Sequence, residues 1–190
     1  ILSTIAETLF MDCDNVMMAA ELEVMDNCTP ADSIHIAFSE VFADTSASCP
    51  SNYVIYRDWT VTDSCGNSSS ASQVVIVTDE EGPVFAPMAD TMTFDNDPDL
   101  CSANLSIEVN ASDACSDTIQ YFHTVQFAGG NDTSGVGNVA NYIYPVGIST
   151  ITWSAEDNCG NVTSKVSTIE VLDVDIPVLG CINSVVFPLK

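Results

Sequence analysis

The sequence has very few basic residues. Only three Lys and Arg stand against 27 Asp and Glu, which gives the 190-residue chain a formal net charge of −24. Nucleic acids and anionic membranes attract proteins through Lys and Arg, which neutralise phosphates. We therefore expect no nucleic-acid partner and no direct insertion into a membrane. The acidity fits either a solvated surface or carboxylates that hold a cation.

Residues suited to catalysis or zinc binding are also scarce. The two His, His35 and His123, each lie in a run expected to be a strand, without a nucleophile or metal ligand at a recognisable spacing. No two Cys are as close as the paired ligands of a zinc site. Gly129-Gly130 lacks the Lys of a phosphate-binding loop. We also find no signal peptide and no apolar run of membrane-spanning length. We expect a protein that is not an enzyme.

The most prominent feature of the sequence is an internal repeat. The stretch Trp59-Thr-Val-Thr-Asp-Ser-Cys-Gly-Asn67 returns as Trp153-Ser-Ala-Glu-Asp-Asn-Cys-Gly-Asn161. Each copy is an alternating run, a Cys-Gly-Asn turn and a second β-branched run (73–79 or 167–173), which predicts a β-hairpin. Cys65 and Cys159 are 94 positions apart. A period of this length is typical of one β-sandwich module per copy.

The module boundaries follow from matching prolines. Pro83 opens the second copy, and Pro177 opens what should be a third. We therefore predict an all-β chain of two tandem β-sandwich modules plus the first strand of a third. The predicted bounds are 1–82, 83–176 and 177–190, with short linkers at 79–83 and 173–177. The chain would then be part of a longer tandem array.

Three local predictions accompany this fold. Residues 16–25 are strong helix formers, but their counterpart 104–112 alternates, so we expect strands in both copies. The Gly-rich residues 129–138 account for the extra length of copy two and should form a flexible loop. The alternation of the last strands directs Val75, Val77, Ile169 and Val171 inward, with Trp59 and Trp153 in the core.

Seven short motifs carry a family resemblance. They are Met25-Asp-Asn-Cys28, Arg57-Asp-Trp59, Asp63-Ser-Cys-Gly-Asn67, Val77-Thr-Asp-Glu-Glu-Gly-Pro83, Ser112-Asp-Ala-Cys115, Tyr144-Pro-Val-Gly-Ile-Ser-Thr-Ile-Thr-Trp153 and Asp157-Asn-Cys-Gly-Asn161. These motifs resemble the hyalin-repeat (HYR) family and its relatives in large bacterial cell-surface proteins. Copy one is similar to the variant common in giant adhesins of gliding bacteria, but it carries Cys49 where copy two has Tyr-Pro-Val-Gly. The resemblance covers nearly the whole chain, and it implies two tandem immunoglobulin-like sandwich modules that serve in adhesion or as a stalk, and no enzymatic chemistry.

The eight Cys suit a disulfide framework in an oxidising compartment. In the two copies Cys13 corresponds to Cys101 and Cys28 to Cys115. The Asp-x-Cys turns of one copy can meet at one pole of a sandwich, and the remaining Cys lie at the opposite pole or beyond the module. A connectivity within one module, such as Cys101–Cys115, and free thiols are alternatives. The predicted pairs are Cys28–Cys65, Cys115–Cys159, Cys13–Cys49 and Cys101–Cys181.

Carboxylates gather at the predicted boundary between the two copies. The linker of copy one and the near pole of copy two would bring hard oxygen ligands together, which suits Ca²⁺. A solvated acidic rim, in which Asp157 and Asn161 only support a turn, is the alternative. The predicted ligand set is Asp79, Glu80, Glu81, Asp113, Glu156, Asp157 and Asn161.

The sequence thus favours a structural repeat of an extracellular bacterial adhesin or surface filament, whose partners are neighbouring repeats. One alternative is an adhesive module that binds surface glycans or proteins through residues 129–138. Another is a filament subunit in which residues 178–188 complete a neighbour's sheet. The resemblance to gliding-bacterium surface proteins also implies O-glycans on Ser33, Thr91 and Thr118, each in an Asp-Ser/Thr-aliphatic or Asp-Thr-Met triplet.

Overall fold

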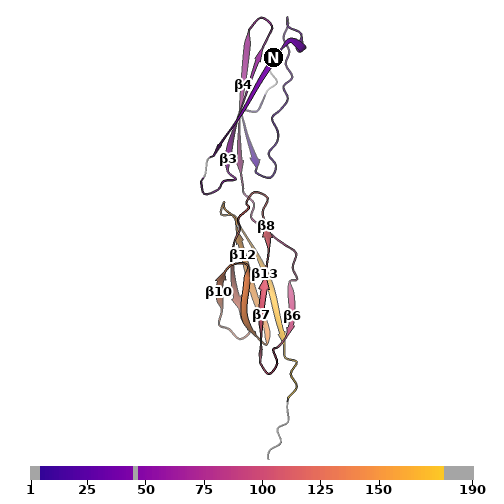
Figure 1. Ribbon diagram of the computed structural model, residues 1–190, viewed down its shortest axis with the longest axis vertical. Helices are drawn as coiled ribbons and strands as arrows, with labels where there is room; N and C mark the ends of the chain where they lie inside the picture. The colour runs from indigo at the N-terminus through magenta and orange to yellow at the C-terminus, as the bar shows by residue number, and fades with distance from the viewer. Residues whose placement is uncertain (1–4, 45–46, 178–190) are drawn as a thin grey trace, which may run out of the picture. The chain divides into compact units, whose positions relative to one another are not determined.

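The computed structural model describes residues 5–44 and 47–177, and nearly all of its regular structure is β (Figure 1). The chain forms two compact units. The first contains Ile1–Ala86, Asn110–Tyr121 and Ser154–Ser164, and the second contains Pro87–Val109, Phe122–Trp153 and Lys165–Lys190. The strands are β1 Thr8–Asp12, β2 His35–Asp44, β3 Tyr53–Thr62, β4 Ser68–Thr78, β5 Val84–Phe85, β6 Thr91–Asp95, β7 Ser102–Glu108, β8 Ala111–Ser112, β9 Gln120–Gln126, β10 Thr133–Val136, β11 Val139–Pro145, β12 Gly147–Glu156 and β13 Val162–Leu172; a 3₁₀ turn, η1, covers Ala31–Ser33.

Each copy of the sequence repeat forms its own sheet, and the two sheets have the same strand order. In copy one the strand order is β1-β4-β3-β2, and in copy two it is β6-β13-β12-β9 with β10 added at the edge. The first strand pairs in parallel with the last in both copies, β1 with β4 and β6 with β13. Copy two has a second sheet, β11-β7. This arrangement confirms the predicted all-β, immunoglobulin-like class; residues 178–190, the predicted strand of a third module, lie outside the described residues.

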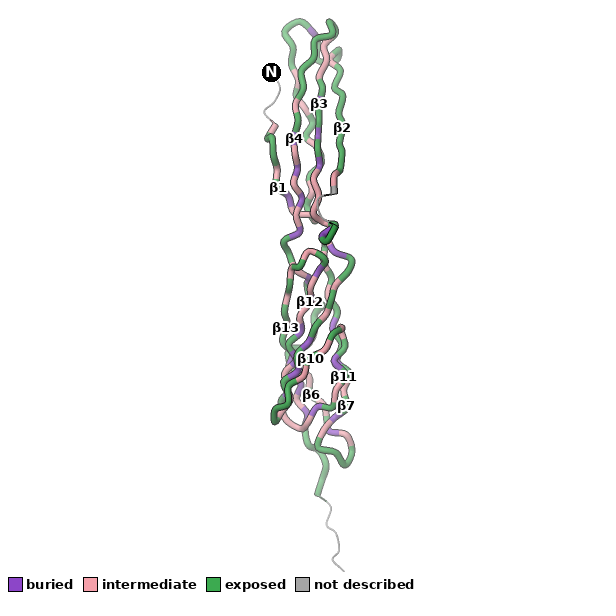
Figure 2. The backbone as a smooth tube through the Cα atoms, turned by 90° about the vertical axis from the view of Figure 1, so that its left-hand side faces the viewer, coloured by how far each residue is buried: buried purple, intermediate pink, exposed green. Residues whose placement is uncertain are grey.

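The predicted core residues are buried. Trp59 and Trp153 have 3% and 0% of their surface exposed, and Val75, Val77, Ile169 and Val171 are each at most 1% exposed. These residues alternate with more exposed neighbours along β3, β4, β12 and β13, because successive side chains of a strand point to opposite faces. Figure 2 shows the same alternation along the backbone. His35 and His123 lie in β2 and β9, as predicted.

The predicted loop at residues 129–138 contains the four-residue strand β10. A tight turn precedes β10, with Gly129 and Gly130 at positive φ, and β10 then pairs antiparallel with β9. A Cβ at Gly135 would lie 2.5 Å from His123 Nε2 and 2.8 Å from the Tyr142 hydroxyl. The Gly-rich composition therefore reflects turn geometry and close packing in this segment, and the loop prediction is wrong for β10.

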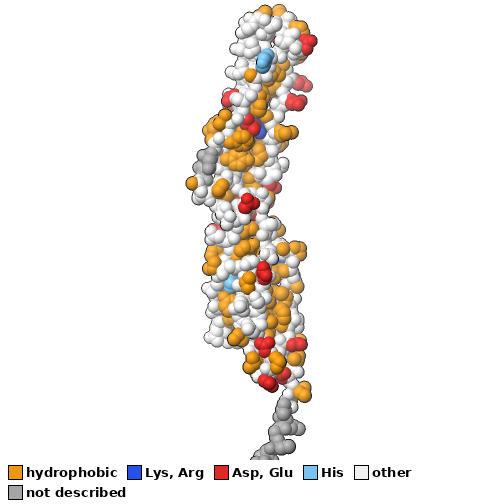
Figure 3. Space-filling model, viewed as in Figure 1, with side chains coloured by type: hydrophobic (Ala, Val, Ile, Leu, Met, Phe, Trp, Pro, Cys, Tyr) orange, Lys and Arg blue, Asp and Glu red, His pale blue; other side chains and the backbone are white. Residues whose placement is uncertain are grey.

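Residues 16–25, predicted to be a strand, form neither strand nor helix. Only their counterpart in copy two, β7, is a strand, because β11 is there to pair with it. In copy one β2 ends at Asp44 and β3 begins at Tyr53, which is too short a connection for a strand like β11. A groove of about 770 Å³ remains between residues 16–22 and the sheet, lined by apolar side chains that include Phe38 and Ile55. Figure 3 shows apolar side chains gathered on the surface of this unit.

Arg57 attaches this irregular segment to the sheet. Its side chain is 3% exposed, and its Nε donates to Glu40 Oε2 at 2.7 Å. Its Nη2 donates to the carbonyl oxygen of Met17 at 2.8 Å, and its Nη1 to Gln73 Oε1 at 3.4 Å. One guanidinium therefore joins three elements of copy one, since its planar group offers several donors in a fixed fork.

Replacing this guanidinium should loosen residues 16–25. We expect R57M to lower the free energy of unfolding by about 1–3 kcal/mol, because Glu40 and the Met17 carbonyl lose charge-assisted hydrogen bonds while the aliphatic stem is kept. Urea denaturation measures the loss, and amide exchange locates it in residues 16–25. K165M, at the other basic residue that the structure describes, is the control and should change stability by no more than about 0.5 kcal/mol. Equal stabilities for R57M and K165M would contradict this role.

Candidate functional site

The first unit contains a cluster of cysteines and carboxylates at the end of β4, which we call the stapled cluster. Two turns of copy two form one side of it. Asp113 Oδ1 accepts hydrogen bonds from the backbone N–H groups of Cys115 (2.9 Å) and Ser116 (2.8 Å). Asp157 Oδ1 accepts from the N–H groups of Cys159 (2.7 Å) and Asn161 (2.9 Å). Each aspartate thus fixes the backbone that carries a cysteine.

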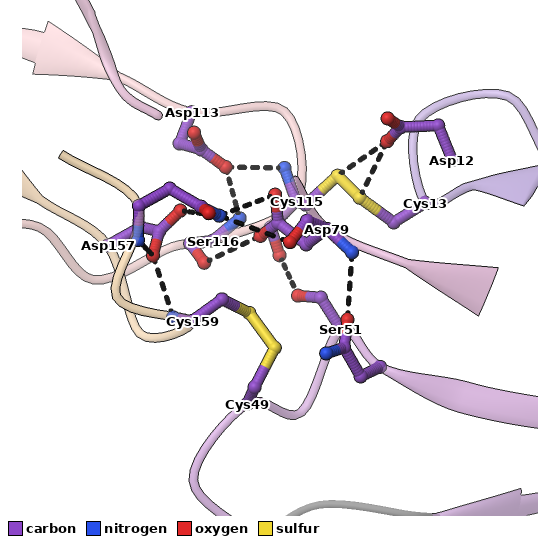
Figure 4. The surroundings of a disulfide bond; sticks show 12 residues. Asp12, Cys13, Cys49, Ser51, Asp79, Asp113, Cys115, Ser116, Asp157 and Cys159 are labelled. Atoms are coloured by element: carbon purple, nitrogen blue, oxygen red, sulfur yellow. Dashed lines mark hydrogen bonds between the residues drawn. A yellow bond between two sulfur atoms is a disulfide. The ribbon is translucent and has the colours of Figure 1, made fainter. Parts of the chain in front are cut away.

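Two disulfides close the stapled cluster (Figure 4). Cys13 bonds to Cys115 with a Cα–Cα distance of 5.9 Å, and Cys49 bonds to Cys159 with a Cα–Cα distance of 4.5 Å. Both bonds join a cysteine of the first sequence copy to a cysteine of the second. They span 102 and 110 residues, so each closes a long loop of the chain.

The predicted pairs Cys13–Cys49 and Cys115–Cys159 are therefore wrong, although the four residues share one site. β1 runs parallel to β4, so Cys13 follows β1 at the end where β4 leaves the sheet. The turn between β2 and β3 brings Cys49 to the same end. The residues that meet there come from different copies. Sequence offsets within one module could not reveal this exchange of partners.

The other predicted bonds are not present among the described residues. Cys28 and Cys65 are free and exposed, although the hydroxyls of their neighbours Thr29 and Ser64 lie 3.2 Å apart. Cys101 is also free and exposed. Its predicted partner, Cys181, lies outside the described residues, so the Cys101–Cys181 bond stays a prediction.

The match of Cys101 to Cys13 fails in the sheet register. Asp12 pairs with Thr78 in copy one, and Asp95 pairs with Leu172 at the same place in copy two. The next backbone N–H donates to the last strand in each copy, Cys13 to Thr78 (3.1 Å) and Asn96 to Leu172 (2.9 Å). Asn96 therefore occupies the position of Cys13. Cys101 lies five positions further along the chain, after a short turn.

Asp79 is the central carboxylate of the stapled cluster. It is 5% exposed, and its ligand oxygens lie within 4.8 Å of those of Asp113 and, separately, of Asp157. Asn161 Nδ2 donates to Asp157 Oδ2 (2.8 Å) and to the Asp79 carbonyl (3.1 Å), so it bridges two of the acids. The nearby sulfurs of Cys115 and Cys159 are in disulfides and offer no thiolate to a metal.

The structure brings together only part of the predicted ligand set. Asp79, Asp113, Asp157 and Asn161 meet, and Glu81 lines a small cavity of about 60 Å³ with Asp79 and Asp113. Glu80 is exposed, and neither Glu80 nor Glu156 belongs to the acidic groups close enough to share an ion in the described part of the chain. Sequence reasoning missed Asp12 and Asp14, which line the same cavity. Asp12 ends β1 and Asp14 follows it, so their place in this cavity could be inferred only once β1 was paired with β4.

The crowding of acids shifts the titration of Asp79. Burial raises the pKa of its carboxyl above the ordinary value of 3.8, and the charges of Asp157, Asp113 and Asp12 raise it further. The carboxylate form is therefore disfavoured in the folded protein. A proton or a cation at this position would relieve the repulsion.

The three predicted glycosylation residues are all exposed. Ser33 lies in η1, Thr91 begins β6, and Thr118 lies between β8 and β9. Modification at these residues stays a prediction. No helix in the described part of the chain is both long and apolar enough to span a membrane.

No protein-family model and no curated protein matches the chain. Solved structures similar to it include Drosophila N-cadherin EC1-3 (20% identity, TM-score 0.37, 65% of this chain and 44% of that one). Others are human mucin-like protocadherin EC1-2 (12%, 0.38, 92% and 99%) and the fibronectin(III)-like modules of Clostridium thermocellum CbhA (16%, 0.36, 95% and 100%). The chain thus spans less than half of the N-cadherin chain. At these identities and scores the similarities carry no functional argument.

The raised pKa of Asp79 predicts a specific pH dependence. The folded state binds the Asp79 proton more tightly than the unfolded state, so its contribution to stability is present at low pH and is lost as pH rises from 3.8 through the folded pKa. D79N should therefore raise the free energy of unfolding at pH 7 relative to wild type, by less than about 1 kcal/mol because water screens the charges. Denaturation of both proteins from pH 4 to pH 7 measures the difference.

The matched control is D132N, which removes an exposed carboxylate outside the stapled cluster. It should leave the shape of the stability–pH curve unchanged. A D79N curve parallel to the wild-type curve over the whole range would contradict the assigned role of Asp79.

Proposed function

We propose that the chain is a structural repeat of an extracellular adhesin or surface fibre, in which the stapled cluster resists extension. The observation that carries the proposal is the pair of disulfides joining the two sequence copies. Disulfides persist in oxidising compartments outside the cytosol. The HYR-like motifs and the repeated all-β sheets support membership in a tandem array of this kind, with neighbouring repeats as partners.

The connectivity explains how such a segment would resist tension. A force applied to the two ends of the chain passes through the disulfides instead of through the residues they bypass. Cys13–Cys115 bypasses 102 residues, including β2, β3, β4 and the linker at 79–83. Cys49–Cys159 bypasses 110 residues. Cys13–Cys115 alone therefore keeps most of copy one from being pulled out, and Cys49–Cys159 alone keeps β3, β4 and most of copy two from being pulled out.

The alternative of an adhesive loop at residues 129–138 has weaker support, because β10, in the middle of that segment, is paired with β9. The proposal also includes binding of Ca²⁺ at the stapled cluster. Asp79, Asp113 and Asp157 offer carboxylate oxygens close together, and Ca²⁺ accepts several such ligands in loose geometry. The ion would replace the proton that the crowded Asp79 otherwise favours.

Pulling a single molecule from both ends tests the mechanical proposal. In oxidising buffer the fully unfolded chain should be shorter than in reducing buffer by about 360–400 Å, which is the contour length of the 110 residues that Cys49–Cys159 bypasses. C49S in oxidising buffer should remain almost as short as wild type, because Cys13–Cys115 still bypasses 102 residues. Equal lengths in oxidising and reducing buffer would refute the proposal.

Thermal melting with and without Ca²⁺ tests the cation. Millimolar CaCl₂ should raise the melting temperature of wild type and of D132N, with an affinity on the order of 10⁻⁴–10⁻³ M. D79N should show no Ca²⁺ effect, because it lacks the carboxylate common to both acidic groups. Identical wild-type melts in CaCl₂ and in chelator would instead establish a solvated acidic rim.

A further inference from the structure

Copy one contains a second pair of turns that matches the pair in the stapled cluster. Asp26 Oδ1 accepts from the backbone N–H groups of Cys28 (2.9 Å) and Thr29 (2.7 Å). Asp63 Oδ1 accepts from the N–H groups of Cys65 (2.8 Å) and Asn67 (2.8 Å). We call these two turns the open pair.

The hydrogen bonds of the open pair agree closely with those of copy two. Asn67 Nδ2 donates to Asp63 Oδ2 at 2.7 Å, and Asn161 Nδ2 donates to Asp157 Oδ2 at 2.8 Å. Gly66 and Gly160 both have φ of 86°. The open pair therefore presents its cysteines on the same backbone framework.

The two pairs of turns differ in whether their cysteines form disulfides. In copy two, Cys115 and Cys159 are each bonded to a cysteine of copy one. In the open pair, Cys28 and Cys65 are free and exposed in the described part of the chain. The corresponding residues of the same repeat thus make disulfides where a partner cysteine is present.

We propose that Cys28 and Cys65 are the attachment points for another copy of this repeat. The cysteine of that copy at the position of Cys13 bonds to Cys28, and the cysteine at the position of Cys49 bonds to Cys65. This inference rests on the proposed function as a tandem repeat and extends it by naming the partner. The result is a second stapled cluster with the same connectivity as the first.

Internal comparison argues against a bond between the two turns of the open pair. Cys115 and Cys159 lie on an equivalent pair of turns, yet neither bonds to the other. The partner also has to resemble copy one. Copy two has Asn96 at the Cys13 position and no counterpart of Cys49, so its corresponding end offers neither cysteine.

The polar groups around the cysteines favour the same partner. In the stapled cluster Ser51 Oγ donates to the Cys115 carbonyl, and Asn161 Nδ2 donates to the Asp79 carbonyl. Cys28 and Asn67 hold the equivalent positions in the open pair. A copy-one end that presents Ser51 and Asp79 would complete both hydrogen bonds, which are independent of the disulfides.

Each new bond forms by two thiol–disulfide exchange steps with a disulfide donor such as glutathione disulfide. The first thiolate attacks the donor and forms a mixed disulfide. The second thiolate then displaces the donor sulfur. Two thiols and one donor disulfide thereby become one protein disulfide and two donor thiols, and the two electrons go to the donor.

The test begins with the chain itself. It is oxidised with glutathione disulfide, alkylated and mapped by mass spectrometry without reduction. We expect Cys13–Cys115 and Cys49–Cys159 peptides, with Cys28 and Cys65 alkylated or carrying glutathione. A Cys28–Cys65 peptide would overturn the proposal.

A longer chain then supplies the partner. Residues 1–90 are joined to residues 8–190, which keeps strand register because Thr8 and Thr91 occupy equivalent positions beside β4 and β13. The added copy one should yield Cys13–Cys28 and Cys49–Cys65 peptides in a monomer, at a yield independent of protein concentration. The absence of either peptide, while Cys13–Cys115 and Cys49–Cys159 form in the same molecules, would overturn the proposal.

The matched control replaces Cys28 and Cys65 of the inner copy by Ser. These side chains are exposed, so folding and the original two disulfides should be unchanged. Neither new crosslink should appear. The pulling measurement on the single chain involves only the first stapled cluster, so a failure of this inference leaves the proposed function standing.

Discussion

The hydrogen bonds from backbone N–H groups to an aspartate Oδ1 are the interaction on which the stapled cluster depends. Asp113 accepts hydrogen bonds from Cys115 and Ser116. Asp157 accepts hydrogen bonds from Cys159 and Asn161. A disulfide tolerates only a narrow range of Cα separations. The turns fix the backbone at Cys115 and Cys159, whose Cα atoms lie 5.9 Å and 4.5 Å from those of Cys13 and Cys49. The same hydrogen bonds recur at Asp26 and Asp63, so the turn is a property of the repeat and not of one disulfide.

The relative magnitudes of charge repulsion and crosslinking explain why the cluster can be so acidic. Two carboxylates about 4 Å apart repel by roughly 1 kcal/mol in water and about 4 kcal/mol at the effective dielectric constant of a protein surface. A disulfide that closes a loop of about 100 residues stabilises the folded state by about 4.7 kcal/mol in the chain-entropy model. Each bond therefore outweighs the repulsion between Asp79 and any one neighbouring carboxylate. The covalent links therefore hold the site, and protons or cations adjust it.

The sequence was sufficient for features that are repeated locally. The hairpins around Trp59 and Trp153, the inward valines of β4 and the Asp-x-Cys turns each depend on residues close in the chain. The disulfide partners of Cys13 and Cys49 depend on which strand ends meet, and the sequence offsets do not contain that information. The strand predicted for residues 16–25 from their counterpart in copy two was also wrong. Their counterpart is a strand because of β11, which copy one has no room to form.

The two copies also differ at the position shared by Cys13 and Asn96. Asn96 Nδ2 donates to the Leu100 carbonyl (2.7 Å) and Asp175 Oδ2 (3.0 Å), and its Oδ1 accepts from the Val174 N–H (3.0 Å). Copy two thus uses hydrogen bonds where copy one uses a disulfide. A hydrogen bond contributes about 1 kcal/mol and reforms after breaking, whereas the disulfide responds only to reductants. A chain that alternates the two kinds of end would combine links that yield under tension with links that do not.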